Sequence, residues 1–161
     1  MIRLIVAMDR KRGIARHGSR PWDIPDDMAY FVEQTKSHGG VVLVGGTTFR
    51  NDLKGKPLAQ RITYVLTKNN QPIHGVQLVH DLRRWFAGLG NQDVWVIGGA
   101  NVYEQVMKAD LADELYITQI DADLDCDQFF PEYEAKFHLD SQSEPHEQNG
   151  FHFTYSRYTR T

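Results

Sequence analysis

Hydrophobic residues along this chain gather in short runs separated by glycine-rich or polar breaks. Residues 1–8, 41–44 and 94–97 are apolar nearly throughout, and strand-forming residues also fill 61–67 and 76–79. Short apolar runs without polar alternation are typical of strands that are covered on both faces. The pattern therefore predicts five strands of a buried, largely parallel sheet.

Helical spacing is found between these runs. A helix is expected to begin at Pro25, because proline fits the first helical turn. Its expected inward face consists of Met28, Phe31, Val32 and Thr35. Asp81 is a suitable cap for a second helix, and a third helix should follow the strand at 94–97 and cover residues 100–107.

The last third of the chain has a different pattern. Residues 111–120 lead into a further strand, and residues 151–158 alternate between apolar and polar side chains. Such alternation predicts an antiparallel strand, which should pair with residues 137–141. We predict one α/β domain over residues 1–161, with a mostly parallel central sheet of about eight strands, an antiparallel C-terminal strand and flanking helices.

Composition narrows the class of protein. The chain has 161 residues, 41% of them hydrophobic, and a net charge of -3, so a folded domain without a nucleic-acid partner is expected. The single Cys126 cannot form an internal disulfide, which fits a reducing cytoplasm. Neither a signal peptide nor an apolar run near the ~20 residues of a membrane helix is recognisable. The histidine spacing gives no support for a metal site.

One acidic stretch has candidate chemistry. Asp23, Asp26 and Asp27 stand among prolines and aromatic residues at the start of the first expected helix. Asp27 precedes Phe31 by four residues, which places it on or beside the apolar face, whereas Asp26 is rotated by about 100°. A carboxylate among apolar side chains resists ionisation unless a partner compensates. The alternative is that all three are solvated residues at a helix start.

Two strands end in glycine pairs that open helices, at 45–46 and at 98–99. Free backbone N–H groups at such turns suit a phosphate, although short turns also use glycine for backbone reasons alone. Together the two units suggest a ligand with more than one phosphate at the carboxyl edge of the sheet. Tyr103 stands where a third glycine of the GxGxxG pattern would fall, so a standard Rossmann assignment is poor.

Two polar segments have weaker signals. Residues 9–19 have no apolar period and are expected to form a long surface loop, either a functional lid or a passive connection. Alternating aspartates at 121–125 resemble an EF-hand loop, but its central glycine and terminal glutamate are missing, so calcium binding is rejected.

The chain resembles the dihydrofolate reductase family in five blocks. They are residues 4–7, 21–31, 96–103, 117–118 and 130–131. The blocks occur in order from the first strand towards the last, and the Pro-Trp…Pro-x-Asp…Phe and Ile-Gly-Gly…Tyr patterns are specific. The resemblance implies reduction of 7,8-dihydrofolate to tetrahydrofolate by hydride transfer from NADPH, in a cytoplasmic monomer whose partner is a small-molecule substrate.

The resemblance also implies roles for individual residues. Asp27 would hydrogen-bond the pterin ring and favour protonation of its imine nitrogen, with water as the immediate donor, and Thr118 would orient this carboxylate. Arg61 would grip the glutamate carboxylate of the folate. The implied catalytic residues are Asp27, Trp22, Thr118 and Tyr103. The implied substrate-binding residues are Ile5, Asp27, Met28, Phe31, Lys56, Leu58, Arg61, Ile97 and Thr118.

The implied cofactor site is larger and departs from the family pattern. Its residues would be Ala7, Ile14, Gly18, Ser19, Gly46, Thr47, Thr48, Thr67, Lys68, His80, Gly98, Gly99, Ala100, Asn101, Val102 and Tyr103. Gly46, Thr47 and Asn101 stand where many family members have basic residues on the cofactor phosphates. Lys68 and His80 are then left to hold the 2′-phosphate, which makes the choice between NADPH and NADH an open question.

Two other functions remain as alternatives. One is a reductase on the same fold that acts on a pyrimidine of riboflavin biosynthesis. The other is a non-catalytic nucleotide-binding domain, which would keep the phosphate turns without needing a buried acid. The joint occurrence of Asp27, Phe31, Arg61 and Thr118 favours a folate site over both.

Overall fold

The computed structural model describes all residues from 1 to 161. The strands are β1 (Ile2–Met8), β2 (Gly13–Ala15), β3 (Val41–Gly45), β4 (Ile62–Leu66), β5 (Val76–Val79), β6 (Val94–Val96), β7 (Glu114–Ile120), β8 (Gln128–Phe129), β9 (Phe137–Gln142), β10 (His146–Gln148) and β11 (Phe151–Arg160). The helices are α1 (Pro25–Lys36), α2 (Gly46–Asn51), α3 (Leu82–Ala87) and α4 (Ala100–Lys108).

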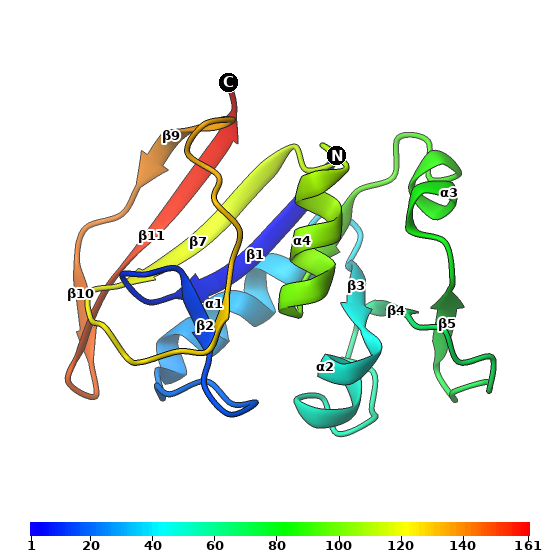
Figure 1. The fold of residues 1–161 in the computed structure, drawn as a ribbon, viewed down its shortest axis with the longest axis horizontal. Helices are drawn as coiled ribbons and strands as arrows, with labels where there is room; N and C mark the ends of the chain where they lie inside the picture. Colours follow the sequence, from blue (N-terminus) through cyan, green and yellow to red (C-terminus); the bar gives the residue numbers. More distant parts are fainter.

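A nine-stranded sheet runs through the molecule in the order β10-β11-β7-β1-β6-β3-β4-β5, with β9 also paired to β11 (Figure 1). From β7 to β5 all neighbouring strands are parallel. β11 pairs with β7 in the antiparallel sense, and β9 pairs with β11 as expected. The predicted mostly parallel sheet with an antiparallel C-terminal strand is confirmed.

Residues 9–19 differ from the expected irregular loop. Gly13–Ala15 form β2, which pairs with β8 in a separate two-stranded sheet. The pairing has a register irregularity, and its partner lies more than a hundred residues later in the chain. Such a short strand has no local hydrophobic period, so only a long-range partner makes it a strand. The edge strand β10 was missed for a related reason, because its residues are polar and mostly exposed.

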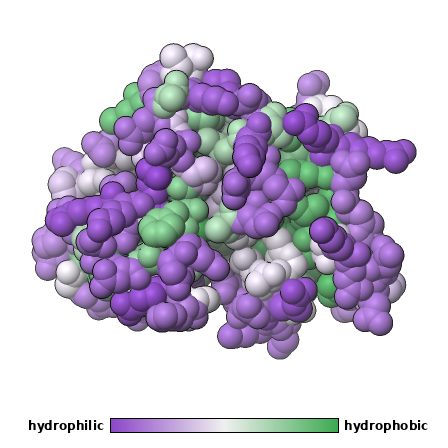
Figure 2. All heavy atoms as spheres, in the orientation of Figure 1, coloured by the Kyte–Doolittle hydropathy of each residue, from purple (hydrophilic) through white to green (hydrophobic).

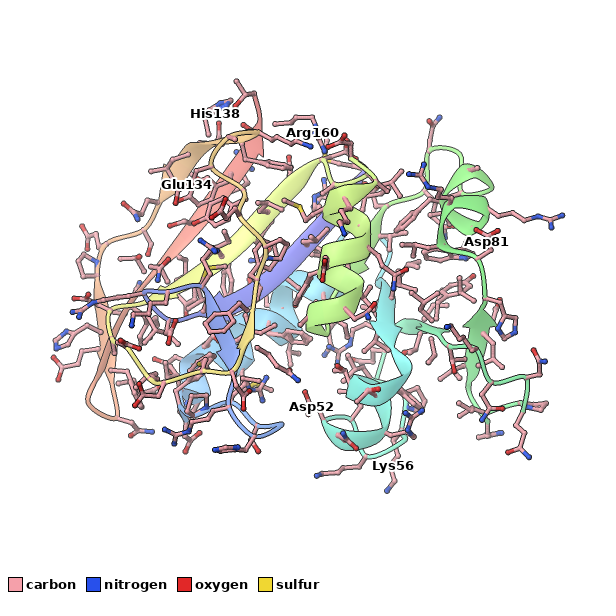
Figure 3. All side chains as sticks on the ribbon, in the orientation of Figure 1. Asp52, Lys56, Asp81, Glu134, His138 and Arg160 are labelled. Carbon is pink, nitrogen blue, oxygen red and sulfur yellow. The ribbon has the colours of Figure 1, made fainter.

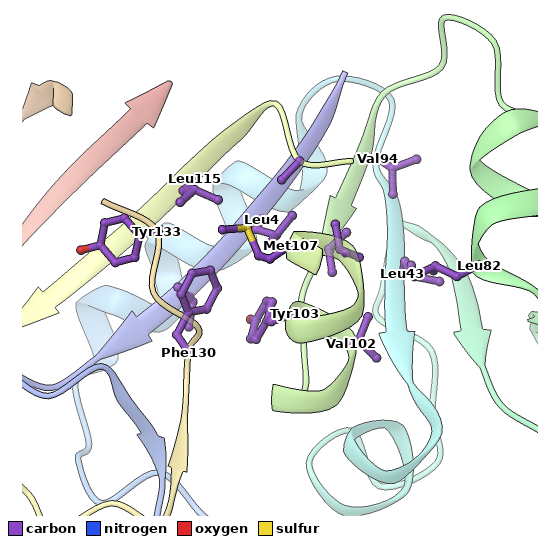
Figure 4. Packing of buried hydrophobic residues seen from close by; sticks show 14 of the residues in the cluster. Leu4, Leu43, Leu82, Val94, Val102, Tyr103, Met107, Leu115, Phe130 and Tyr133 are labelled. Atoms are coloured by element: carbon purple, nitrogen blue, oxygen red, sulfur yellow. The ribbon is translucent and has the colours of Figure 1, made fainter. Parts of the chain in front are cut away.

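The side chains of β1 alternate between two cores. Leu4, Val6 and Met8 belong to the largest buried cluster, which includes residues of α3 and α4 and the aromatic residues after β8. Figure 4 shows Leu4 in this cluster, near Tyr103 and Met107 of α4. Ile5 packs on the opposite side with Val42 and Trp95, next to α1. Both sheet faces are therefore covered, which explains why the central strands are apolar throughout.

The expected inward face of α1 is only partly correct. Thr35 is its one buried residue, whereas Met28 is 43% exposed. Met28 and Phe31 border an open cleft rather than the closed core. Helical periodicity identified the apolar face but could not distinguish a core from a ligand cleft.

Most of the face shown in Figure 2 is hydrophilic, and hydrophobic residues show mainly in hollows between the polar side chains.

Asp81 caps α3 as expected by accepting a hydrogen bond from the backbone N–H of Arg84. None of the helices combines the length and the apolar character that crossing a bilayer requires.

Candidate active site

A cleft opens where β1, β3 and β6 end and α1, α2 and α4 begin. Many of the residues that the sequence pointed to line it together. They are Ile5, Ala7, Ile14, Gly18, Ser19, Asp27, Met28, Phe31, Thr47, Thr48, Ile97, Gly98, Gly99, Ala100, Tyr103 and Thr118. Clefts at the carboxyl ends of parallel strands are the usual ligand sites of α/β sheets.

Asp27 lies on the wall of this cleft, in the first turn of α1. The hydroxyl of Thr118 on β7 donates a 2.7 Å hydrogen bond to Asp27 Oδ1. Burial raises the pKa of Asp27 above its ordinary value, and the Thr118 hydroxyl and the charge of Arg20 oppose this rise. The carboxyl group is thus held in one orientation in surroundings that disfavour its charge.

The two glycine pairs are parts of one structure. β3 and β6 are parallel neighbours, and Gly45 N–H donates a 2.8 Å hydrogen bond to the carbonyl oxygen of Gly98, whose peptide bond to Gly99 is cis. A methyl group at Gly99 would lie only 2.6 Å from Thr48 Oγ1, and one at Gly45 would lie 2.8 Å from Val102. Glycine is therefore required for the close approach of the two strand ends and their helices.

Tyr103 lines the cleft and links two of the elements that surround it. Its hydroxyl donates a 2.6 Å hydrogen bond to the carbonyl oxygen of Ile5, and its backbone N–H donates to the carbonyl oxygen of Gly99. The side chain is buried against Phe130, which raises the pKa of the phenol well above its usual range. A neutral hydroxyl in this position ties β1 to the start of α4.

Four of the implied catalytic and substrate residues lie outside the cleft lining. Trp22 is buried in a small cluster with Ile24, Ile120 and Phe153. Leu58 packs near Ile5 and Phe31, in the cluster that borders the cleft. Lys56 is exposed, and Figure 3 shows it at the outer end of the region around α2.

Arg61 is held beside α1. Its Nε donates to the carbonyl oxygen of Ala59, and its Nη1 donates a 2.9 Å hydrogen bond to Thr35 Oγ1. Burial lowers the pKa of the guanidinium. The guanidinium is therefore positioned next to the C-terminal half of α1, beyond the cleft lining.

The remaining implied cofactor residues also lie beyond the cleft lining. Val102 is buried beneath the glycine pairs, and Asn101 is exposed and paired with Gln105. Thr67 and Lys68 follow β4, and His80 follows β5, so all three meet at the same sheet edge as Gly46. His80 Nδ1 lies 2.7 Å from the carbonyl oxygen of Thr67.

Arg50 was missed from the sequence. A methyl group at Gly46 would lie 3.2 Å from Arg50 Nη1 and 3.5 Å from Thr67 Oγ1. Arg50 thus occupies the space left by the absent side chain of Gly46, four residues earlier on α2, and it forms no ion pair or hydrogen bond within the chain. The available signal was this i, i+4 spacing, since long helical side chains lean towards the preceding turn.

Other cleft residues were also missed. They are Val6, Ala15, Arg20, Tyr30, Asn51, Asp52 and Gln128. Tyr30 could have been found, because it lies three residues after Asp27 on the same helix face. Its ring stacks on that of Tyr155, with centroids 4.0 Å apart. Gln128 could not have been found, because only the pairing of β8 with β2 brings it to the cleft.

Comparisons with known proteins agree with this arrangement. The sequence model of the family described as dihydrofolate reductase matches residues 1–160. The dihydrofolate reductase of Bacillus subtilis strain 168 is 31% identical over 165 residues, covering 99% of this chain and 95% of that protein. The Drosophila melanogaster dihydrofolate reductase is 32% identical over 170 residues, covering 94% and 93%.

A solved structure is similar over the whole chain. It is dihydrofolate reductase from Enterococcus faecalis complexed with NADP(H) and RAB-propyl, with a TM-score of 0.86 and 27% identity, covering 100% of this chain and 96% of that one. The fold and the cleft define a single-domain α/β protein with its ligand site at the carboxyl edge of a parallel sheet. Within that class, the chain belongs to the dihydrofolate reductase family.

Proposed function

We propose that this protein reduces 7,8-dihydrofolate to 5,6,7,8-tetrahydrofolate with NADPH as the hydride donor. The observation that carries the proposal is the hydrogen bond from Thr118 to Asp27 on the wall of a cleft that Gly98 and Gly99 also line. Asp52 lines the same cleft, but it follows the C-terminal end of α2 and has no such partner. Membership of the family supports this reaction.

Asp27 has two features that suit the proton side of the reaction. The reduction adds a hydride to the carbon of the ring imine and a proton to its nitrogen. A carboxyl group aimed by Thr118 can hydrogen-bond the amino and ring N–H groups of the pterin and so favour the protonated imine. Water is the immediate proton donor in this proposal. Met28, Phe31 and Ile5 would supply the apolar walls of the pterin site and limit access of other water.

The residues on the other side of the cleft fit a dinucleotide. The turn at Gly98 and Gly99 brings backbone to the cleft at the start of α4, where it could approach a phosphate, and Thr47 and Thr48 add hydroxyl groups at the same edge. The bound nicotinamide would supply the hydride, whereas the protein orients it and excludes water. Ala7 and Ile14 would border the nicotinamide. The expectations of a cytoplasmic monomer with only small-molecule partners belong to the same proposal.

Arg50 bears on the choice of cofactor. Its guanidinium and the Thr67 hydroxyl lie around the position of Gly46, and Lys68 and His80 follow the neighbouring strands at the same sheet edge. Neither Arg50 nor Lys68 has an acidic partner within the chain. Such a group suits a phosphate monoester. It would replace the basic residue that many relatives have at the position of Gly46, which favours NADPH over NADH.

The test follows the loss of nicotinamide absorbance with purified protein and dihydrofolate, using NADPH and NADH in parallel. Asp27→Asn should lower turnover by at least ~100-fold at neutral pH while cofactor binding persists. Acid pH should restore turnover partly, and only for a substrate that is already protonated. Asp26→Asn is the matched control, because Asp26 is the exposed neighbour in the same helical turn.

Two outcomes would overturn the proposal. Undiminished turnover in Asp27→Asn would remove the role of this carboxyl group. A folded wild-type protein that binds NADPH without consuming it in the presence of dihydrofolate would favour the riboflavin-pathway reductase or the non-catalytic domain.

A further inference from the structure

Asp9 is a buried carboxylate outside the proposed chemistry. It directly follows β1, is 1% exposed and forms no ion pair. Its side chain instead accepts three backbone hydrogen bonds. Lys11 N–H and Gly13 N–H donate to Oδ1 at 2.9 and 2.7 Å, and Leu124 N–H donates to Oδ2 at 3.1 Å. A buried carboxylate is tolerated where donors compensate for lost water.

Through these three bonds, Asp9 links a local turn to a distant part of the chain. Two of them close the turn that begins the segment of residues 9–20, here called the lid segment. The third reaches the connection between β7 and β8, residues 121–127. The backbone N–H of Arg10 also donates to the carbonyl oxygen of Ala122, so the root of the lid segment lies against this connection.

Gly13 and Cys126 close the packing around Asp9. A methyl group at Gly13 would lie 2.4 Å from Cys126 Cβ and 2.8 Å from Asp9 Oδ1. No side chain fits there without moving the lid segment away from residues 121–127. Burial, together with the adjacent carboxylate of Asp9, raises the pKa of the Cys126 thiol to about 11. The contact between residues 9–13 and residues 121–127 is here called the junction. The only cysteine of the chain is therefore half-buried inside this junction and kept as the unreactive thiol.

The junction supports one wall of the cleft. Ile14 and Ala15 follow Gly13 directly and line the cleft, as do Gly18 and Ser19 further along the lid segment. Further along the segment, Asp127 N–H donates to the carbonyl oxygen of Ala15, and the contacts of Arg16 with Leu124 and of His17 N–H with Asp127 are exposed. The side-chain bonds that are shielded from solvent are therefore those of Asp9, at the root of the segment.

We propose that Asp9 is a positioning residue, whose carboxylate fixes the root of the lid segment against residues 121–127 and thereby holds the cofactor side of the cleft in place. The assignment of that side to the cofactor rests on the proposed function. The junction itself does not depend on it, because the hydrogen bonds and the packing of Cys126 define it.

The first test uses Cys126 as a native reporter. Asp9→Asn keeps the shape of the side chain but replaces one acceptor oxygen by an NH2 group, which cannot accept from a backbone N–H. The amide can keep the turn bonds of Oδ1 only by losing the bond from Leu124. Modification of Cys126 by a thiol reagent under native conditions should then become at least ~10-fold faster.

Two further variants separate opening of the junction from the loss of a charge near Cys126 and from the loss of an exposed ion pair. Gly13→Ala keeps the Asp9 charge, so faster modification in this variant cannot come from loss of that charge and must come from opening. Asp121→Asn removes an exposed ion pair between Arg10 and the same connection, and it should leave the modification rate unchanged. A less stable variant also exposes Cys126 more often by global unfolding. Denaturant unfolding of each variant measures this contribution, so that it can be subtracted from the increase in the modification rate.

The second test is kinetic. In Asp9→Asn the KM for NADPH should rise several-fold, with little change in the KM for dihydrofolate, because only the cofactor wall is released. Wild-type modification rates in both Asp9→Asn and Gly13→Ala would overturn the junction. A rise in both KM values alike would overturn its link to the cofactor. A wild-type protein without dihydrofolate turnover, but with the expected modification rates, would refute the proposed function and leave the junction standing.

Discussion

Thr118 on β7 donates a 2.7 Å hydrogen bond to Asp27 on α1, across 91 positions of sequence. This donor stabilises the ionised carboxylate, so its removal should raise the pKa of Asp27 further. In Thr118→Val we expect the carboxyl titration, followed by carbon NMR, to move to higher pH. We expect kcat/KM at neutral pH to fall by roughly 5- to 10-fold.

Thr63→Val is the matched control for that substitution. The Thr63 hydroxyl is buried on β4 without a hydrogen-bond partner. Its loss should leave the Asp27 titration and turnover unchanged and should raise the free energy of unfolding by about 1 kcal/mol. An equal shift of the Asp27 titration in both variants would show that the effect comes from the sheet and not from the hydrogen bond.

Asp27 should reduce stability at neutral pH. Because its pKa is raised in the folded state, its contribution favours folding at acid pH and is lost as the pH rises through the folded pKa. Asparagine does not ionise, so the Asp27→Asn variant does not lose this stability as the pH rises. The free energy of unfolding of the variant, relative to wild type, should therefore increase from acid to neutral pH in denaturant titrations. A relative stability that falls with pH would contradict the assignment of a raised pKa.

We propose, from the resemblance, that Arg61 contacts the glutamate carboxylate of the folate. Arg61→Leu should then weaken folate binding by about 10- to 100-fold, since it would remove this charge-assisted contact. Turnover at saturating substrate should change much less, because the contact is remote from the hydride. Equilibrium binding of folate and of a pteridine without the glutamate tail measures this difference. Equal weakening for both ligands would refute the role. Arg83→Leu, at an exposed position on α3, controls for the loss of a positive charge.

Arg50→Gln should weaken binding of NADPH by about 10-fold and leave binding of NADH unchanged, because only NADPH has the 2′-phosphate. Fluorescence titration of each cofactor, without substrate, measures this independently of activity. Lys54→Gln is a suitable control, since Lys54 is exposed close to α2 but absent from the group around Gly46. A similar loss for NADPH and NADH would mean that Arg50 acts on a phosphate common to both.

Much of the architecture was determined by local sequence. The apolar runs gave the central strands because strands covered on both faces have no polar alternation, as β1 and β3 illustrate. Pro25 and Asp81 marked the starts of α1 and α3 because their backbone chemistry suits those positions. The aromatic surroundings of Asp27 pointed to a perturbed carboxyl group before its partner was known.

Tertiary structure decided what depends on contacts between distant residues. Sheet order brought the two glycine turns side by side and made them one site, although each is a weak signal alone. Long-range pairing made a strand of residues 13–15, and folding buried Asp9 among backbone donors from two segments. A short polar segment has no periodicity that reveals its partner, because its conformation is stabilised by groups far away in the chain. For the same physical reason, the position of Cys126 beside Asp9 followed only from the folded structure.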